Sequence, residues 1–264
     1  MSNIPKKIHY CWFGGKPLPE ITKNYIASWK RQCPEYEIVE WNEKNFDVSY
    51  NQYTLEAFQM GKWAFVADVA RLYALVNYGG IYLDTDVEVV KNFDDLLDTH
   101  AFIGFQSEKD IQTAVMASEK GNILFTELLH EYDGTHFLNS NGQYDLTTNV
   151  QRFTRTCLKY GLKQNNKHQV VRTCSFYPTE YFCPLNVSTR ELKKTDNTYT
   201  IHYFDGSWLT DVEKYENKVK LKFNNVFGVR LGGLIARFVS IIKYRGVRSA
   251  IGEYILWCQK KRKK

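Results

Sequence analysis

Two aspartates, Asp84 and Asp86, stand two residues apart directly after the aromatic and aliphatic run 81–83. On a β-strand, residues with this spacing project from the same face. Two converging carboxylates repel each other, and burying them without partners is costly. A divalent cation relieves both problems, and oxygen ligands suit Mg²⁺ or Mn²⁺. The pair therefore predicts a metal site that can hold a diphosphate, whereas a lone pair of this kind can also be a polar turn on a sheet edge.

The sequence before the two aspartates favours the metal site. Residues 62–78 have apolar positions at helical spacing, and Gly79 and Gly80 end that helix before the β-rich segment 81–90. This places the aspartates at the carboxyl end of a strand, where open α/β sheets bind their ligands. Asp68 and Arg71 lie three apart on the helix and can share a face. They suit sugar hydroxyls and a phosphate, or else they form a local ion pair.

The elements around this segment alternate between strands and helices. We expect strands at 7–13 and 36–41, with a helix at 20–32 between them. Further along, 122–132 and 147–160 have helical character, and 169–173 and 199–203 resemble strands. This alternation predicts an α/β fold with an open, mostly parallel sheet covered by helices.

Composition excludes several classes of protein. Of the 264 residues, 44% are hydrophobic and 24% are charged, which excludes a disordered or fibrous chain. No uncharged apolar run approaches the length of a membrane-spanning helix, and no apolar stretch follows the first lysines as in a secretory signal. Six cysteines without a CxxC pair predict buried, reduced thiols. We expect a soluble or peripheral cytoplasmic protein.

Positive charge is concentrated at the end of the chain. Residues 229–264 contain ten Lys and Arg against one acid, Glu253, although the net charge of the whole chain is only +6. A nucleic-acid-binding protein more often has its basic patch on the folded body, so no nucleic acid is expected as a partner. Apolar residues at 234, 235, 238, 241 and 242 share one helical face, and those at 247, 250, 251, 254, 257 and 258 share another. We expect a domain at 1–215 and a basic amphipathic tail at 216–264 that binds an anionic membrane surface; helices packed on the body are the alternative.

The chain resembles the DXD-containing glycosyltransferases of family 32, the capsular-polysaccharide and mannosyltransferase-like group. It is more distantly similar to the catalytic domains of bacterial glucosylating toxins. The matching stretches are 4–15, 28–30, 41–42, 64–88 and 201–208. The resemblance implies a GT-A fold, a nucleotide-sugar-binding α/β/α sandwich, and a Mn²⁺ or Mg²⁺ ion. It also implies transfer of a hexose, with retention, from a UDP- or GDP-sugar to a saccharide. That acceptor would be lipid-linked, in bacterial surface polysaccharide synthesis at the inner face of the cell membrane.

The resemblance also assigns roles to individual residues. Asp86 matches the direct metal ligand and Asp84 a contact to ribose, sugar and metal, while Asp68 and Arg71 match a pair that contacts the donor sugar. The remaining matches are residues near the base, ribose, diphosphate or metal: Trp12, Tyr82, His202, Ser207 and Trp208. Asn149 is expected to make a polar contact to the donor or the acceptor. Three of these have structural alternatives, since Trp12 and His202 suit a core and the segment around Asn149 suits a helix cap.

Two other functions fit the same residues. One is a Mg²⁺-dependent phosphoryl-transfer hydrolase, which would usually need more acids around two metals. The other is a catalytically silent, membrane-bound subunit of a polysaccharide-synthesis complex. The chain keeps all the candidate site residues, which argues against the silent subunit. These residues are Asp68, Arg71, Asp84, Asp86 and His202.

Overall fold

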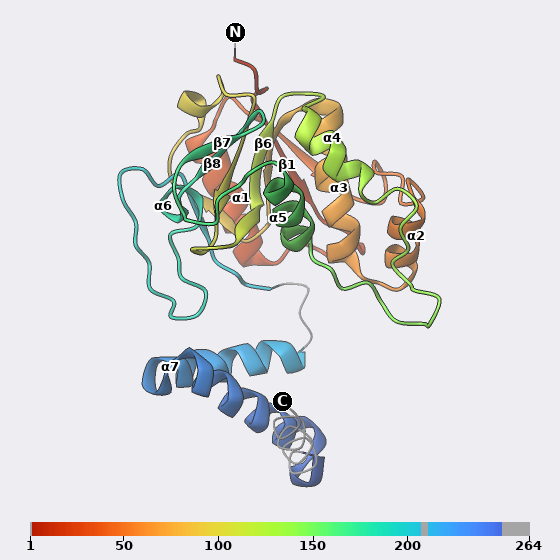
Figure 1. The fold of residues 1–264 in the computed structure, drawn as a ribbon, viewed down its shortest axis with the longest axis vertical. Helices are drawn as coiled ribbons and strands as arrows, with labels where there is room; N and C mark the ends of the chain where they lie inside the picture. Colours follow the sequence, from red (N-terminus) through yellow and green to blue (C-terminus); the bar gives the residue numbers. More distant parts are fainter. Residues whose placement is uncertain (1, 207–210, 250–264) are drawn as a thin grey trace. The chain divides into compact units, whose positions relative to one another are not determined.

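The computed structural model describes residues 2–206 and 211–249 (Figure 1). These residues form two compact units. The first consists of residues 2–185 and 192–204, and the second of residues 186–191, 205–206 and 211–249.

The first unit contains a seven-stranded sheet of spatial order β2-β1-β3-β6-β5-β8-β7. Its strands are β1 (Lys7–Cys11), β2 (Glu37–Trp41), β3 (Gly80–Leu83), β5 (Ala101–Phe105), β6 (Ile111–Ser118), β7 (Gln169–Val171) and β8 (Cys174–Tyr177). The pairs β2–β1, β1–β3 and β5–β8 are parallel, and the pairs β3–β6, β5–β6 and β7–β8 are antiparallel. All strands therefore run in one direction except β6 and β7, which confirms the expected mostly parallel sheet.

Helices cover both faces of this sheet (Figure 1). Helices α2 (Gln52–Gln59), α3 (Trp63–Tyr78), α4 (Ile123–His130) and α5 (Asn149–Lys159) contribute to one hydrophobic cluster. Helix α1 (Glu20–Gln32), the short helices at Asp94–Leu96 and α6 (Thr179–Phe182), and strand β4 (Val87–Val89) contribute to the other. Alternate side chains of one strand enter different clusters, as Ile81 and Tyr82 of β3 do. The expected three-layer α/β/α arrangement is confirmed.

A two-stranded sheet joins distant parts of the chain. Strand β4 pairs antiparallel with β9 (Thr200–His202), and Val87 lies opposite His202. This pairing brings the end of the first unit to the segment that follows Asp86.

Each element expected from the sequence is found within a few residues of its expected ends. The segment 81–90 is the one that differs, because it forms two strands, β3 and β4, separated by a turn at residues 84–86. The five described cysteines are buried free thiols; Cys258 lies outside the described residues. Among the described residues, none of the helices combines the length and apolar character that crossing a bilayer requires.

The second unit is built from α7 (Asp211–Arg245). Gly228 has φ 77° and ψ 162°, so α7 consists of two helical arms, 211–227 and 229–245. The arms lie against each other: the rings of Tyr215 and Tyr244 are 5.8 Å apart, and Lys243 Nζ lies 3.7 Å from the Tyr215 ring centre. The helical character expected for the start of the tail is confirmed. Of the second apolar set expected there, Val247 alone falls within the described residues.

Candidate active site

Helix α3 and the turn after it hold Asp68, Arg71 and the two aspartates in one place. Helix α3 ends at Gly79, and β3 begins at the next residue. Gly79 and Gly80 have φ values of 66° and 107°, which residues with a side chain rarely adopt. A Cβ on Gly80 would lie 2.8 Å from the Lys7 carbonyl oxygen on β1. The two glycines therefore let strand β3 begin directly after the end of α3, without an intervening loop.

The two aspartates lie on the turn between β3 and β4, so the expectation that they project from one strand face is wrong. The Asp84 backbone N–H donates to the Ala114 carbonyl on β6 at 2.8 Å, and the Val87 N–H donates back to the Asp84 carbonyl at 3.1 Å. The tight turn, rather than strand alternation, makes the carboxylates converge. Their location at the carboxyl end of β3 is as predicted.

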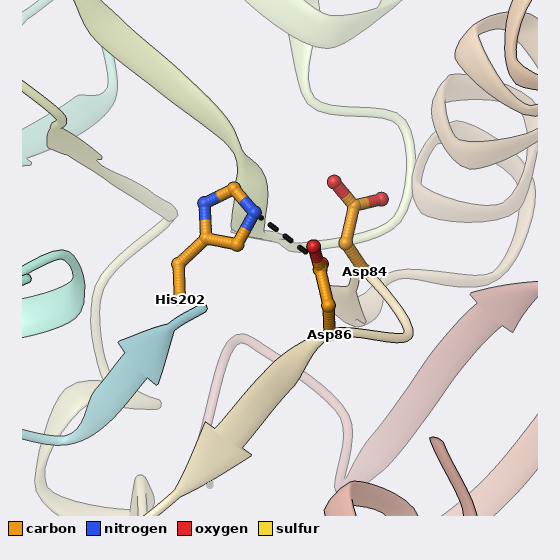
Figure 2. A group of neighbouring side chains, drawn as sticks. All are labelled: Asp84, Asp86 and His202. Carbon is orange, nitrogen blue, oxygen red and sulfur yellow. Dashed lines mark ion pairs between the residues drawn. The ribbon is translucent and has the colours of Figure 1, made fainter. Parts of the chain in front are cut away.

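Asp84, Asp86 and His202 form a cluster of potential metal ligands. One oxygen from each carboxylate and one imidazole nitrogen lie within 4.8 Å of one another (Figure 2). Ligand atoms about 2.1 Å from a shared cation are separated by roughly 3 to 4.3 Å in octahedral coordination, so the three atoms lie close to the spacing that one divalent ion requires. The donors also fit, because carboxylates suit Mg²⁺ and Mn²⁺ and imidazole suits transition metals.

His202 is held against Asp86 by the pairing of β4 with β9. Its Nε2 lies 3.3 Å from Asp86 Oδ1, and the Phe204 ring packs 3.9 Å from the imidazole centre. Burial disfavours the charged imidazole, but the charge and hydrogen bond of Asp86, together with Cys183, outweigh burial and raise the pKa of His202 to about 10. Two carboxylates beside one imidazole give the site a surplus of negative charge, which a cation would neutralise.

Arg71 connects Asp68 to the turn. Its Nη2 lies 3.1 Å from Asp68 Oδ1, and its Nη1 lies 3.2 Å from Asp84 Oδ1. The same Nη1 donates to the Thr113 carbonyl on β6 at 2.9 Å. The Arg71 side chain is 7% exposed. In the predicted pair Arg71 is therefore buried, Asp68 is mostly buried, and Arg71 is shared with Asp84, which is more than a local ion pair on a solvated helix.

Tyr82 holds the Asp84 carboxylate through a hydrogen bond. It lies on β3, is 1% exposed, and its hydroxyl donates to Asp84 Oδ1 at 2.9 Å. The Arg71 guanidinium carbon lies 4.6 Å from the Tyr82 ring centre. Tyr82 thus contacts a site carboxylate in this structure.

The other predicted residues have varied positions. Trp12 follows β1, the strand next to β3, and its indole N–H donates to the Lys16 carbonyl at 2.6 Å. Asn149 is the first residue of α5, and its amide donates to the Asp68 carbonyl at 3.5 Å. The helix cap considered for this segment is provided by Thr148, which leaves Asn149 beside Asp68. Ser207 and Trp208 lie outside the described residues.

Comparison with known proteins matches the same part of the chain. Residues 19–103, about a third of the chain, match the family described as the glycosyltransferase sugar-binding region containing the DXD motif. This region of the chain is similar to a glycosyltransferase sugar-binding region. It includes Asp68, Arg71, Asp84 and Asp86, while Trp12, Asn149 and His202 lie outside it.

Curated relatives of the chain include proteins named as a mannosyltransferase and a galactosyltransferase. Inositol phosphoceramide mannosyltransferase 3 of Schizosaccharomyces pombe is 32% identical over 131 residues, which are 45% of this chain and 34% of the relative. Lactosylceramide 4-alpha-galactosyltransferase of Mus musculus is 29% identical over 152 residues, 53% of this chain and 40% of the relative. The chain spans about two fifths or less of the length of these relatives.

Solved glycosyltransferase structures are also similar to the chain. PaToxG glycosyltransferase has 19% identity and a TM-score of 0.46, over 59% of this chain and 68% of that one. Galactosyltransferase LgtC has 13% identity and a TM-score of 0.41, over 80% of this chain and 92% of that one.

Four residues next to the site were missed by the sequence analysis. Tyr53, Tyr132, Asp145 and Arg152 form a polar cluster near Asp68. They come from α2, the turn after α4, the segment before α5, and α5 itself. No short-range spacing links them, so the sequence alone carries no signal for this cluster.

Proposed function

We propose that the chain is a metal-dependent, retaining glycosyltransferase of the GT-A type. It would transfer a hexose from a UDP- or GDP-sugar to a hydroxyl of a saccharide, and the acceptor would be lipid-linked in bacterial surface polysaccharide synthesis. The observation that carries this proposal is the group of Asp84, Asp86 and His202 donor atoms within 4.8 Å of one another. The group lies beside the buried Asp68–Arg71 pair and partly within the matched sugar-binding region.

The metal in this proposal is Mn²⁺ or Mg²⁺, held by Asp84, Asp86 and His202. When bound, such an ion neutralises charge on the diphosphate of the donor, and charge stabilisation is commonly the largest catalytic effect. A set of two carboxylates and one imidazole favours Mn²⁺ over Mg²⁺, which prefers oxygen ligands.

The residues of the chain orient the donor. Arg71 holds Asp68 and Asp84 in fixed positions through its two terminal nitrogens, and Tyr82 fixes Asp84 further. A preorganised Asp68 can accept hydrogen bonds from sugar hydroxyls without paying side-chain entropy at binding. Trp12, at the carboxyl end of the neighbouring strand, offers an aromatic face to the base. We assign no nucleophile, because with retention the departing phosphate oxygen can take the acceptor's proton.

Replacing the proposed ligand tests the metal site. We expect Asp86→Asn to abolish the metal-dependent part of donor binding and to reduce transfer at least 100-fold, because an amide oxygen is a weaker, uncharged ligand. Binding of UDP- and GDP-sugars to the wild type and the variant is measured by calorimetry with and without Mn²⁺. Asp98→Asn serves as the matched control, because Asp98 is exposed and precedes the amino end of β5. Asp84 and Asp86 instead follow the carboxyl end of β3. Unchanged Mn²⁺-dependent binding in Asp86→Asn would overturn the metal assignment.

A second proposal concerns location. We propose that α7 binds an anionic membrane surface and keeps the enzyme peripheral at the inner face of the cell membrane, near a lipid-linked acceptor. The second arm of α7 supports this, because it carries Arg230, Arg237, Lys243 and Arg245 and no acid. It also exposes apolar side chains at helical spacing.

A further inference from the structure

Four buried polar atoms near Asp68 have no hydrogen-bond partner among the residues that the structure describes. They are the Tyr53 and Tyr132 hydroxyls, Asn149 Oδ1 and Arg152 Nε. Their residues are 0%, 1%, 2% and 6% exposed, respectively. Buried polar atoms are almost always hydrogen-bonded, because an unmet donor or acceptor costs free energy. Four such atoms beside a proposed substrate-binding carboxylate point to a ligand that brings hydrogen-bonding groups.

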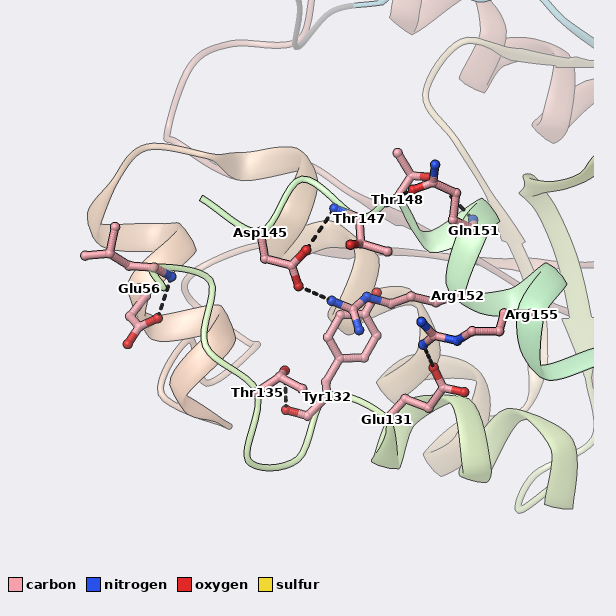
Figure 3. A network of polar contacts seen from close by, with 11 residues as sticks. Glu56, Glu131, Tyr132, Thr135, Asp145, Thr147, Thr148, Gln151, Arg152 and Arg155 are labelled. Carbon is pink, nitrogen blue, oxygen red and sulfur yellow. Dashed lines mark hydrogen bonds and ion pairs between the residues drawn. The ribbon is translucent and has the colours of Figure 1, made fainter. Parts of the chain in front are cut away.

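These side chains form one cluster. The Tyr53 and Tyr132 rings lie 4.9 Å apart, and the Arg152 guanidinium carbon lies 5.6 Å from the first ring centre and 4.8 Å from the second. Figure 3 shows Arg152 between Tyr132 and Asp145, whose carboxylate pairs with the guanidinium Nη2. Nε, another donor of the same guanidinium, is the Arg152 atom without a partner.

The cluster is continuous with the proposed donor site. The Asn149 side-chain amide donates to the Asp68 backbone carbonyl at 3.5 Å, and the charge of Arg152 acts to lower the pKa of the Asp68 carboxyl group. Asp68 in turn pairs with Arg71. Asp68 therefore connects the metal turn on one side with the tyrosines and Arg152 on the other.

The chemistry of the cluster matches hydroxyl groups. Burial raises the pKa of both tyrosines far above neutrality, so both phenols are uncharged and can donate as well as accept. Asn149 Oδ1 accepts only, and Arg152 Nε donates only. A polyol presents groups that both donate and accept, whereas a phosphate presents acceptors alone and would leave Asn149 Oδ1 unpaired.

We propose that Tyr53, Tyr132 and Arg152, with Asn149, form an inner subsite that binds hydroxyl groups of the transferred sugar and selects among donor sugars. This inference rests on the proposed glycosyl transfer and extends it to the residues that set specificity. A sugar with an absent or inverted hydroxyl leaves one of these buried groups unpaired, and sites of this kind discriminate strongly against such analogues.

Removing single hydroxyls tests the subsite. We expect Tyr53→Phe and Tyr132→Phe to keep or raise the melting temperature of the free protein, because each removes a polar atom that has no protein partner. UDP or GDP should bind each variant within twofold of the wild type. The preferred nucleotide sugar should bind 3- to 10-fold more weakly, and the preference over sugars that differ at one hydroxyl should shrink.

Tyr36→Phe provides the matched control. The Tyr36 hydroxyl donates to Asp94 Oδ1 at 2.7 Å, so its removal should lower the melting temperature and leave donor binding unchanged. Affinities are measured by calorimetry with Mn²⁺ for UDP, GDP and a panel of their gluco-, galacto-, manno- and N-acetyl sugars.

The outcomes separate the inference from the proposed function. If the wild type binds neither the nucleotides nor any nucleotide sugar, the proposed function fails, and the subsite fails with it. If the wild type binds nucleotide sugars but both variants keep wild-type affinity for each of them, the subsite is overturned and the function stands. The subsite is also overturned, and the function stands, if the wild type binds the nucleotide sugars no more tightly than the free nucleotides. Lower melting temperatures with unchanged sugar affinity would show that the hydroxyls bind ordered water instead.

Discussion

Asp68 shows how a single site residue can oppose folding. Burial raises the pKa of its carboxyl group to about 6 from an ordinary value of 3.8, although Arg71 pulls in the other direction. The folded chain therefore binds this proton more tightly than the unfolded chain does. The free energy of unfolding consequently falls as the pH rises from about 4 to about 6, by up to about 3 kcal/mol. A carboxylate kept in such a place is expected to serve binding rather than stability.

We therefore expect Asp68→Asn to be more stable than the wild type at pH 7.5 by about 1–3 kcal/mol, and to lose that advantage near pH 4. Arg71 keeps Asp84 and the Thr113 carbonyl as partners in this variant. Urea unfolding of both proteins at several pH values measures the difference, and donor binding should be lost in the variant.

Asp94→Asn is the control with the opposite sign. A hydrogen bond from Tyr36 lowers the pKa of Asp94, so its carboxylate favours folding at neutral pH and loses that effect in acid. The Asp94 variant should be destabilised at pH 7.5 and should approach the wild type as the pH falls. A stability difference for Asp68→Asn that does not change with pH would contradict the raised pKa.

At the scale of elements, the turn from α3 to β3 decides where the site residues lie. In Gly80→Ala, the added Cβ would lie 2.8 Å from the Lys7 carbonyl oxygen in a backbone conformation with φ 107°. We expect a loss of about 3 kcal/mol or more, since strain and a clash with β1 add together. Gly121→Ala has a similar positive φ of 73° but meets no atom within 4 Å, so it should cost about 1 kcal/mol. Thermal unfolding compares the two, and equal losses would show that the contact with β1 is unimportant.

Local sequence patterns predicted the elements that carry the site better than the elements at the centre of the sheet. Helix α3, its glycine end and strand β3 follow from apolar spacing and turn residues. Strand β6 in the middle of the sheet and its neighbour β5 were not predicted, because every residue in both is buried and neither alternates. Periodicity reports a boundary between core and solvent, and a fully buried strand has none.

The candidate site shows the same division. Asp68, Arg71, Asp84 and Asp86 lie within one short stretch and were predicted, and family resemblance added His202, which β4–β9 pairing brings to Asp86. Tyr53, Tyr132 and Arg152 are distant in sequence, and only the packing of α2, α4 and α5 gathers them. Contacts that depend on helix packing leave no local spacing in a single sequence.

At the scale of the whole molecule, α7 combines positive charge with exposed apolar surface. Leu231, Leu234, Phe238 and Ile242 recur at helical spacing along the second arm and are 48%, 49%, 40% and 36% exposed. Val226 and Phe227, beside the bend at Gly228, are 70% and 49% exposed. An apolar stripe on a basic helix that is too polar to span a bilayer fits the interface of an anionic membrane.

We expect the full chain to sediment with vesicles that contain phosphatidylglycerol, much less with pure phosphatidylcholine, and less at 0.5 M salt because ions screen the attraction. Replacing Leu234 and Phe238 together by Asp should weaken binding at least tenfold. The change removes apolar area that the membrane would bury, and it adds repulsion from the anionic lipids. Val170→Asp with Leu158→Asp is the matched control, because those residues are 60% and 44% exposed on the first unit. If both double variants bind vesicles as the wild type does, α7 is not the attachment surface. If they weaken binding equally, the effect is one of net charge. A loss confined to the α7 variant would place membrane attachment on this arm, because the two variants have the same net charge.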